Sequence, residues 1–176
     1  TASDPTFGVV PSNALKLTRV AEMFQWEEEK STHTTKTEGG GTRIETTYSY
    51  HQTWSEGLIN SGSFDDSSSY QNPSSMPYSS QEFAANPIAL GSYTLSNDLV
   101  NKINWYSDLN NDGSLISVDN ISDEYARQNM VIYGNGFYMG DNPGYPDIGD
   151  MKIKFQYVPE GTVSLIAAQT GSTFSS

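Results

Sequence analysis

The chain contains no cysteine among its 176 residues and only two histidines. The absence of cysteine excludes disulfides, thiolate nucleophiles and cysteine metal sites. Two histidines without cysteine supply no zinc-binding motif. Basic residues are also scarce: nine lysines and arginines stand against 21 aspartates and glutamates, which gives a net charge of −12. This balance argues against a nucleic-acid partner, which would require a basic face.

Long hydrophobic runs are missing as well. The longest apolar run, Val163–Ala168, is interrupted by Ser164 and is far shorter than the ~20 residues of a membrane helix. Aromatic residues make up 12% of the chain, with 11 tyrosines, and this content argues against disorder. The length fits one folded domain. We expect a lead-in segment over residues 1–14, a single domain over 15–170 and a tail over 171–176.

Most of the remaining pattern is typical of strands. Alternating residues predict a strand over 15–29 that continues through the polar residues 31–38. The triple glycine at 39–41 supplies a turn, and residues 44–54 return as a second, threonine-rich strand. Together they predict a long hairpin with a polar distal end.

The other expected elements are shorter. Residues 55–60 are expected to form a helical turn, followed by a loop anchored by Phe64, Tyr70, Met76 and Tyr78; a mobile linker is the alternative. Helices are expected from Ser96, as N-cap, to Ser107 and over 122–127. Strands are expected over 130–139, with a hairpin turn at 134–136, then over 151–157 and 162–169. The sequence therefore predicts an antiparallel, β-dominated α+β fold with long hairpins and one or two short helices.

Residues 108–119 match the spacing of an EF-hand calcium loop. Oxygen-bearing side chains occupy alternate positions before Gly113, which stands where such a loop turns sharply. The expected helices on either side match the helix–loop–helix context. The predicted ligands are Asp108, Asn110, Asp112, Ser114 through its carbonyl, and Asp119. A calcium ion held here would be structural, and the alternative is a surface turn closed by its own side chains.

The segment from Gly136 to Asp150 is rich in turn residues and aromatics and leads into the alternating residues 151–157. It is a candidate binding loop, whose residues of interest are Tyr138, Asp141, Asn142, Tyr145, Asp147 and Asp150. Its aspartates could supply the carboxylate pair of a glycoside hydrolase, but acids beside glycine and proline are more often turn formers. No catalytic residue is assigned.

Four segments together resemble the LUMA (transmembrane protein 43) family. They are 20–26 (VAEMFQW), 48–61 (with Tyr48-Ser49-Tyr50, Trp54 and Ile59-Asn60-Ser61), 64–76 (with Phe64-Asp65 and Asn72-Pro73-Ser74-Ser75-Met76) and 136–150 with the strand after it. The resemblance covers most of residues 15–170. It implies the extramembrane, luminal or periplasmic domain of a microbial-type relative, from a membrane-anchored or processed precursor. It also implies self-association into a homo-oligomer and contact with membrane or envelope proteins, with the membrane reached only through helices absent from this chain.

Three functions follow as hypotheses. The first is a non-catalytic structural or scaffolding domain that acts by self-association or partner binding and is stabilised by calcium. The second is a calcium-dependent module that binds carbohydrate or a cell surface, in which tyrosine rings stack on sugars. The third is an enzyme that modifies envelope lipid or glycan, which would need a pocket with convergent carboxylates.

Overall fold

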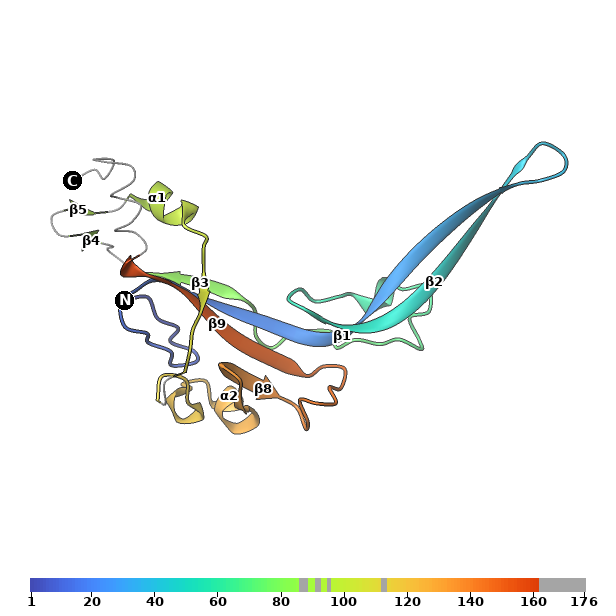
Figure 1. Cartoon of the computed structure of the whole chain (residues 1–176). Coiled ribbons are helices and arrows are strands. Elements are labelled where there is room, and N and C mark those ends of the chain that lie inside the picture. The colour runs from blue at the N-terminus through green and yellow to red at the C-terminus, as the bar shows by residue number, and fades with distance from the viewer. Residues whose placement is uncertain (86–88, 91–92, 95, 112–113, 162–176) are drawn as a thin grey trace.

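The computed structural model describes residues 1–85, 89–90, 93–94, 96–111 and 114–161 (Figure 1). The strands are β1 (Ala14–Lys36), β2 (Thr42–Ser55), β3 (Gln81–Ala84), β4 (Ala89–Leu90), β5 (Tyr93–Thr94), β6 (Ser107–Asp108), β7 (Val131–Tyr133), β8 (Gly136–Met139) and β9 (Met151–Pro159). The helices are α1 (Asn97–Lys102) and α2 (Glu124–Asn129), with 3₁₀ turns η1 (Ser61–Ser63) and η2 (Val118–Asn120).

Strand β1 is the spine of a seven-stranded sheet. The sheet has the order β2-β1-β9-β8-β7, with β3 paired to β1 and β6 paired to β9. The first half of β1, Ala14–Met23, pairs with β9, and within it Lys16–Arg19 also pairs with β3. From Met23 onward β1 pairs with β2. Every pairing is antiparallel, which confirms the predicted β-dominated α+β fold and its long hairpin.

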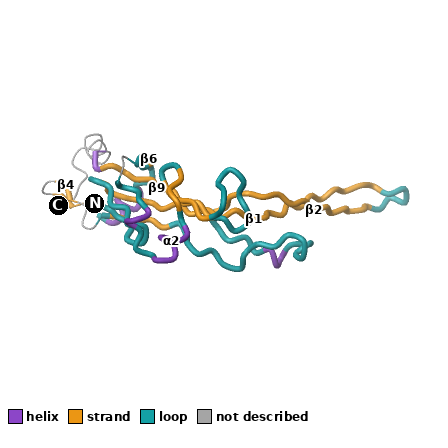
Figure 2. Tube along the Cα trace, turned by 90° about the horizontal axis from the view of Figure 1, so that it is seen from below, coloured by secondary structure: helices purple, strands orange, loops and turns teal. Residues whose placement is uncertain are grey.

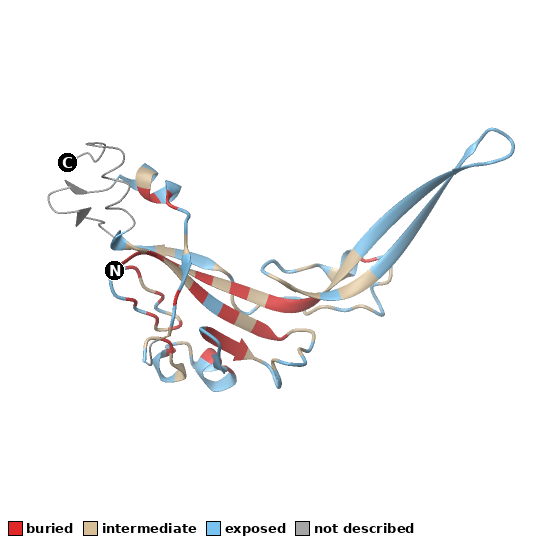
Figure 3. Cartoon of the chain, viewed as in Figure 1, coloured by how far each residue is buried: buried red, intermediate tan, exposed pale blue. Residues whose placement is uncertain are grey.

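The core lies where β1, β9 and β8 meet the N-terminal segment and α2 (Figure 3). Strand β9 alternates as predicted, with Met151, Ile153 and Phe155 buried. Phe7 is fully buried, and its ring centroid lies 5.8 Å from that of Phe137. The first residues of the chain, expected as a lead-in, therefore supply part of the core.

The predicted hairpin turn between residues 134 and 136 is confirmed, because Tyr133 pairs with Gly136 at the end of the β7–β8 hairpin. Position 136 also requires a glycine because of its close contact with β9. A Cβ placed there would lie 1.8 Å from the carbonyl oxygen of Ile153, so the absent side chain lets β8 approach β9.

Two expected helical segments are corrected. The Ser96 N-cap is confirmed, since its hydroxyl accepts from Leu99 N–H, but α1 ends at Lys102 rather than at Ser107. The chain becomes extended at Ile103, whose side chain is buried and whose carbonyl accepts from Lys16 Nζ at 3.0 Å. The turn expected over 55–60 lies later in the chain, as η1. Asn60 is its N-cap, and the side-chain oxygen of Asn60 accepts from Gly62 N–H.

The second expected helix is present, and the last expected strand is not described. The helix expected over 122–127 is α2, which begins at Glu124 with Asp123 as N-cap. The strand expected over 162–169 lies outside the described residues. Within the described part of the chain, neither helix has the length or the apolar character needed to cross a bilayer.

The molecule is elongated because the β1–β2 hairpin projects away from the rest of the sheet (Figures 1 and 2). Beyond the directly paired residues Lys30 and Tyr48, side chains on both strands are exposed (Figure 3). We call residues 30–48 the distal ribbon. Residues Ala14 and Pro159 pair at the opposite end of the sheet, so the chain enters β1 and leaves β9 far from the ribbon tip.

Candidate functional site

The candidate binding loop, which joins β8 to β9, is hydrogen-bonded to β1 at its C-terminal end. Gly149 N–H donates to the Phe24 carbonyl, and Phe24 N–H donates to the Asp150 carbonyl, both at 2.8 Å. The carboxylate of Asp150 is buried and accepts from the Tyr138 hydroxyl at 2.7 Å and from Asp147 N–H at 3.1 Å. Burial and the neighbouring Asp150 raise the pKa of Tyr138 well above its usual range.

The other candidate residues of this loop are exposed to solvent. Asn142 closes a local turn through its side-chain oxygen, which accepts from Gly144 N–H at 2.9 Å. Asp141 and Asp147 are exposed, and the Tyr145 side chain is 81% exposed. The two buried members, Tyr138 and Asp150, therefore hold the corner between β8 and β9.

The predicted calcium loop has a different context from that of an EF-hand. Asp108 lies in β6, and its Oδ1 accepts from Gln156 Nε2 at 3.0 Å. The carbonyl of Ser114 accepts from Asn120 Nδ2 at 2.9 Å. Asn110 Oδ1 accepts from Asn135 Nδ2, and Asp119 lies in η2. Asp112 lies outside the described residues.

The loop is closed by a residue that the calcium pattern leaves unassigned. The side chain of Asn111 donates to the Ile116 carbonyl at 2.9 Å and accepts from Ile116 N–H at 3.1 Å. Ile116 is fully buried, so this amide pins the loop to the core. The helix expected to lead into the loop is present as α1, but it ends at Lys102 rather than at Ser107 and therefore does not reach the loop. A calcium ion in residues 108–119 stays a prediction.

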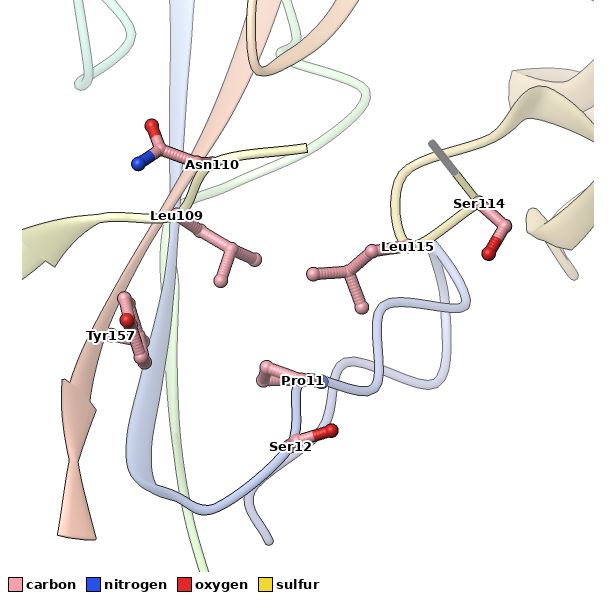
Figure 4. Close-up of a pocket in the computed structure, with 7 residues that line it drawn as sticks. All are labelled: Pro11, Ser12, Leu109, Asn110, Ser114, Leu115 and Tyr157. Atoms are coloured by element: carbon pink, nitrogen blue, oxygen red, sulfur yellow. The ribbon is translucent and has the colours of Figure 1, made fainter. Parts of the chain in front are cut away.

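A cavity of about 480 Å³ lies beside this loop (Figure 4). Leu109 and Leu115 point toward the space between them, whereas the Asn110 side chain points away from it (Figure 4). The described residues that line it are Pro11, Ser12, Leu109, Asn110, Ser114, Leu115 and Tyr157. None of these described lining residues is a carboxylate, a histidine or a basic residue.

One face of the hairpin anchors the long loop that follows β2. The rings of Tyr50 and Tyr70 stack with centroids 3.9 Å apart, and Tyr70 meets Trp26 edge-on at 4.9 Å. The Tyr50 hydroxyl donates to Glu28 Oε2 at 2.7 Å, and the same oxygen accepts from Asp65 N–H. These contacts confirm the predicted aromatic-anchored loop and fix the base of the hairpin.

The opposite face brings together residues that the sequence analysis did not group. Glu27 and Glu29 of β1 lie on this face, and His51 of β2 is the direct cross-strand partner of Glu27. Ligand atoms of the three side chains all lie within 4.8 Å of one another. Among the described residues, this is the one cluster of three or more acidic, histidine or cysteine side chains with such spacing. The register of the hairpin is the signal that would have revealed it.

Comparison with known proteins identifies relatives over nearly the whole chain. A family described as "Transmembrane protein 43" matches residues 23–176. The chain is similar to "Transmembrane protein 43" of Homo sapiens, with 33% identity over 96% of this chain, and to that of Mus musculus, with 34% identity over 96%. It is 28% identical over 90% of its length to "Transmembrane protein 43 homolog" of Drosophila melanogaster. The chain spans 42% of the human and mouse proteins and 40% of the fly protein. No solved structure matches it.

Proposed function

The chain belongs to the transmembrane protein 43 family, a family of membrane proteins, and we propose that it acts as a non-catalytic scaffolding domain outside the bilayer. In this proposal the domain is extracytoplasmic and self-associates through the distal ribbon. The observation that carries the proposal is the exposure of residues 30–48 on both faces, at the far end of the molecule from Ala14 and Pro159.

The geometry favours an arm that reaches away from a bilayer. Strand β1 begins and β9 ends at one end of the sheet, and the ribbon occupies the other. A membrane segment joined to the polypeptide on either side of this domain would leave the ribbon projecting outward. The seven residues of β1 that follow Glu27-Glu28-Glu29, Lys30–Lys36, would add roughly 23 Å of reach at about 3.3 Å per residue.

The ribbon also has the chemistry of a strand-pairing surface. Strand β2 ends the sheet order, so its outer edge has no neighbouring strand within the described part of the chain. Such an edge presents backbone donors and acceptors to another strand. Ile44 is 66% exposed and Tyr48 is 37% exposed, and both lie on the same face of β2. An isolated two-stranded ribbon is marginally stable in water, so a third strand would stabilise it.

Charge favours a second copy of this chain as the partner. The distal ribbon carries three basic and two acidic residues, a net charge of +1, so the rest of the chain carries a net charge of −13. Acidic bodies repel one another, whereas two ribbons of almost no net charge do not. Antiparallel pairing of two β2 edges would join both ribbons through backbone hydrogen bonds and hold the acidic bodies at opposite ends.

Sedimentation velocity over a range of protein concentrations tests this proposal. Because Lys30 and Tyr48 are direct partners, residues 31–47 can be replaced by Asn-Gly, which closes two antiparallel strands with a two-residue turn. We expect the complete chain to associate as its concentration rises and the shortened variant to remain monomeric. Tyr145→Ser, at an exposed aromatic away from the ribbon, is the matched control and should associate normally.

Two results would contradict the proposal. One is a complete chain that stays monomeric at the highest concentration, and the other is a shortened variant that associates as the complete chain does. Calcium in residues 108–119 is a separate part of the proposal. Its test is the thermal midpoint, which should be higher in millimolar calcium than in EDTA and insensitive to calcium in Asp112→Ala.

A further inference from the structure

Three potential metal ligands gather where the hairpin leaves the body of the sheet. Glu27 and Glu29 are two residues apart on β1 and therefore project from the same face, and His51 stands across from Glu27 on β2. His51 Nε2 lies 3.4 Å from Glu27 Oε1, and His51 Nδ1 lies 3.9 Å from Glu29 Oε1. The side chains are 43–66% exposed, so an ion can reach them from solvent.

The two carboxylates lack a cationic partner other than this imidazole. Among the described residues, no lysine or arginine forms an ion pair with Glu27 or Glu29. The carboxylate oxygens of the two glutamates lie within 4.8 Å of each other, and like charges at that distance repel one another. A divalent cation would cancel both charges.

The chain's other histidine provides an internal comparison. His33 stands across from Glu45 in the same hairpin, which repeats the Glu27–His51 pairing. There, however, Arg43 Nε lies 3.4 Å from Glu45 Oε1, and the residue two positions before His33 is Ser31. The distal pair thus has a basic neighbour and lacks a second carboxylate. Only the pair at the base of the hairpin has a ligand set for a dication.

The backbone beneath the cluster is held from the other face. Glu28, between the two ligands, accepts from the Tyr50 hydroxyl and from Asp65 N–H, both at 2.7 Å. Tyr50, next to His51, is stacked on Tyr70. These contacts fix the strand positions that carry all three ligands, so binding an ion requires only rotation of side chains.

We propose that Glu27, Glu29 and His51 form a binding site for a divalent transition-metal ion of the Zn²⁺ class. One imidazole nitrogen and two carboxylate oxygens are ligands that Zn²⁺ accepts, and water would complete its four-coordinate shell. The imidazole favours such an ion over Ca²⁺ and Mg²⁺, which take oxygen ligands. The ion joins β1 to β2 at the base of the distal ribbon. It therefore acts as a cross-strand staple that fixes the direction in which the ribbon projects.

Isothermal titration of the complete chain with ZnCl₂ tests the site. We expect one ion per chain, and binding weaker by at least about tenfold in His51→Ala, because loss even of a group that only orients a ligand costs 10–100-fold. Glu27→Gln and Glu29→Gln should each weaken binding. His33→Ala is the matched control and should bind as the unaltered chain does, as should Asp119→Ala in the predicted calcium loop.

Nuclear magnetic resonance adds a readout that identifies which histidine binds the ion. Sub-stoichiometric ZnCl₂ should shift or broaden the ring resonances of His51 and leave those of His33 in place, and CaCl₂ should leave both in place. The proposal is overturned if His51→Ala binds Zn²⁺ as tightly as the unaltered chain, if His33→Ala weakens binding equally, or if the chain binds no Zn²⁺. All three ligands remain in the variant whose residues 31–47 are replaced, so that variant should still bind the ion even if self-association proves wrong.

Discussion

At the scale of single residues, Asp150 is the key to the corner between β8 and β9. Its buried carboxylate accepts from the Tyr138 hydroxyl and Asp147 N–H, and a Cβ at Gly140 would lie 2.4 Å from it. Tyr138 is itself buried, so its hydroxyl has no access to water if this acceptor is removed. The glycine-, proline- and aspartate-rich segment thus folds around one carboxylate.

We expect Asp150→Ala to lower the free energy of unfolding by about 1–3 kcal/mol, which is the cost of a buried polar group left without its partner. Urea denaturation followed by tryptophan fluorescence measures this loss. Asp141→Ala is the control in the same loop, because Asp141 is exposed, and should change stability by less than about 0.5 kcal/mol. Equal effects of the two substitutions would show that Asp150 has no special role.

At the scale of elements, the edge of β1 beyond β9 is covered by a side chain rather than by a strand. Asn72 Oδ1 accepts from Trp26 N–H at 2.7 Å, and Asn72 Nδ2 donates to the Trp26 carbonyl at 2.9 Å. Its amide thereby imitates the backbone of a neighbouring strand. Gln25 acts similarly toward the next loop, where it accepts from Ile59 N–H and donates to the Gly57 carbonyl.

Asn72→Asp tests this role with almost no change in shape. The substitution replaces the amide donor by a carboxylate oxygen that faces the Trp26 carbonyl, and we expect a loss of about 1–3 kcal/mol. Urea denaturation measures the loss, and hydrogen exchange should show faster exchange of the Trp26 amide. Gln71→Glu, on the exposed neighbour whose amide bonds only to Ser68, is the control. If Asn72→Asp were as stable as Gln71→Glu, the amide would not cap the edge.

The attachment of α2 should depend on pH. Asp123 accepts from the Tyr78 hydroxyl at 2.5 Å and caps α2 by accepting from Ala126 N–H, and these two bonds lower the pKa of Asp123. A carboxyl with a lowered pKa in the folded state contributes stability above its unfolded pKa of about 3.9 and loses it as pH falls through the folded pKa. Acidification below about pH 4 should therefore release this contribution.

Asp123→Asn isolates the effect, because an amide oxygen can still accept both bonds but does not titrate in this range. We expect its unfolding free energy to fall less steeply than that of the unaltered chain as the pH is lowered below about 4. Chemical denaturation at several pH values gives both slopes. Parallel slopes would contradict the assignment.

The elements differ in how far the sequence predicts them. The hairpin was predictable because two-residue periodicity and Gly39–Gly41 are local signals. The end of α1 was not predictable, because the Ile103 carbonyl accepts a hydrogen bond from Lys16, which is distant in sequence. Burial of Phe7 depends on packing against Phe137 and Phe155, which are distant in sequence, so a local periodicity does not predict it. Of the candidate sites, the calcium pattern is a local signal, whereas the Glu27, Glu29 and His51 cluster requires the register of the hairpin.

At the scale of the whole molecule, the core and the distal ribbon have different roles. The core where β1, β9 and β8 meet residues 1–14 and α2 provides stability, and the distal ribbon extends from it with both faces exposed. Charge follows the same division, since the body carries a net charge of −13 and the ribbon a net charge of +1. A domain of this kind repels its copies at the body and leaves the ribbon as the surface where contact is least opposed.

Hydrogen exchange measured at low and high protein concentration tests the central claim most directly. If the ribbon joins two copies, amides within residues 30–48 should exchange more slowly as concentration rises, while those of the edge strand β7 keep the same rate. Unchanged exchange over 30–48, or protection that appears at β7 instead, would contradict the assignment of the ribbon as the contact surface.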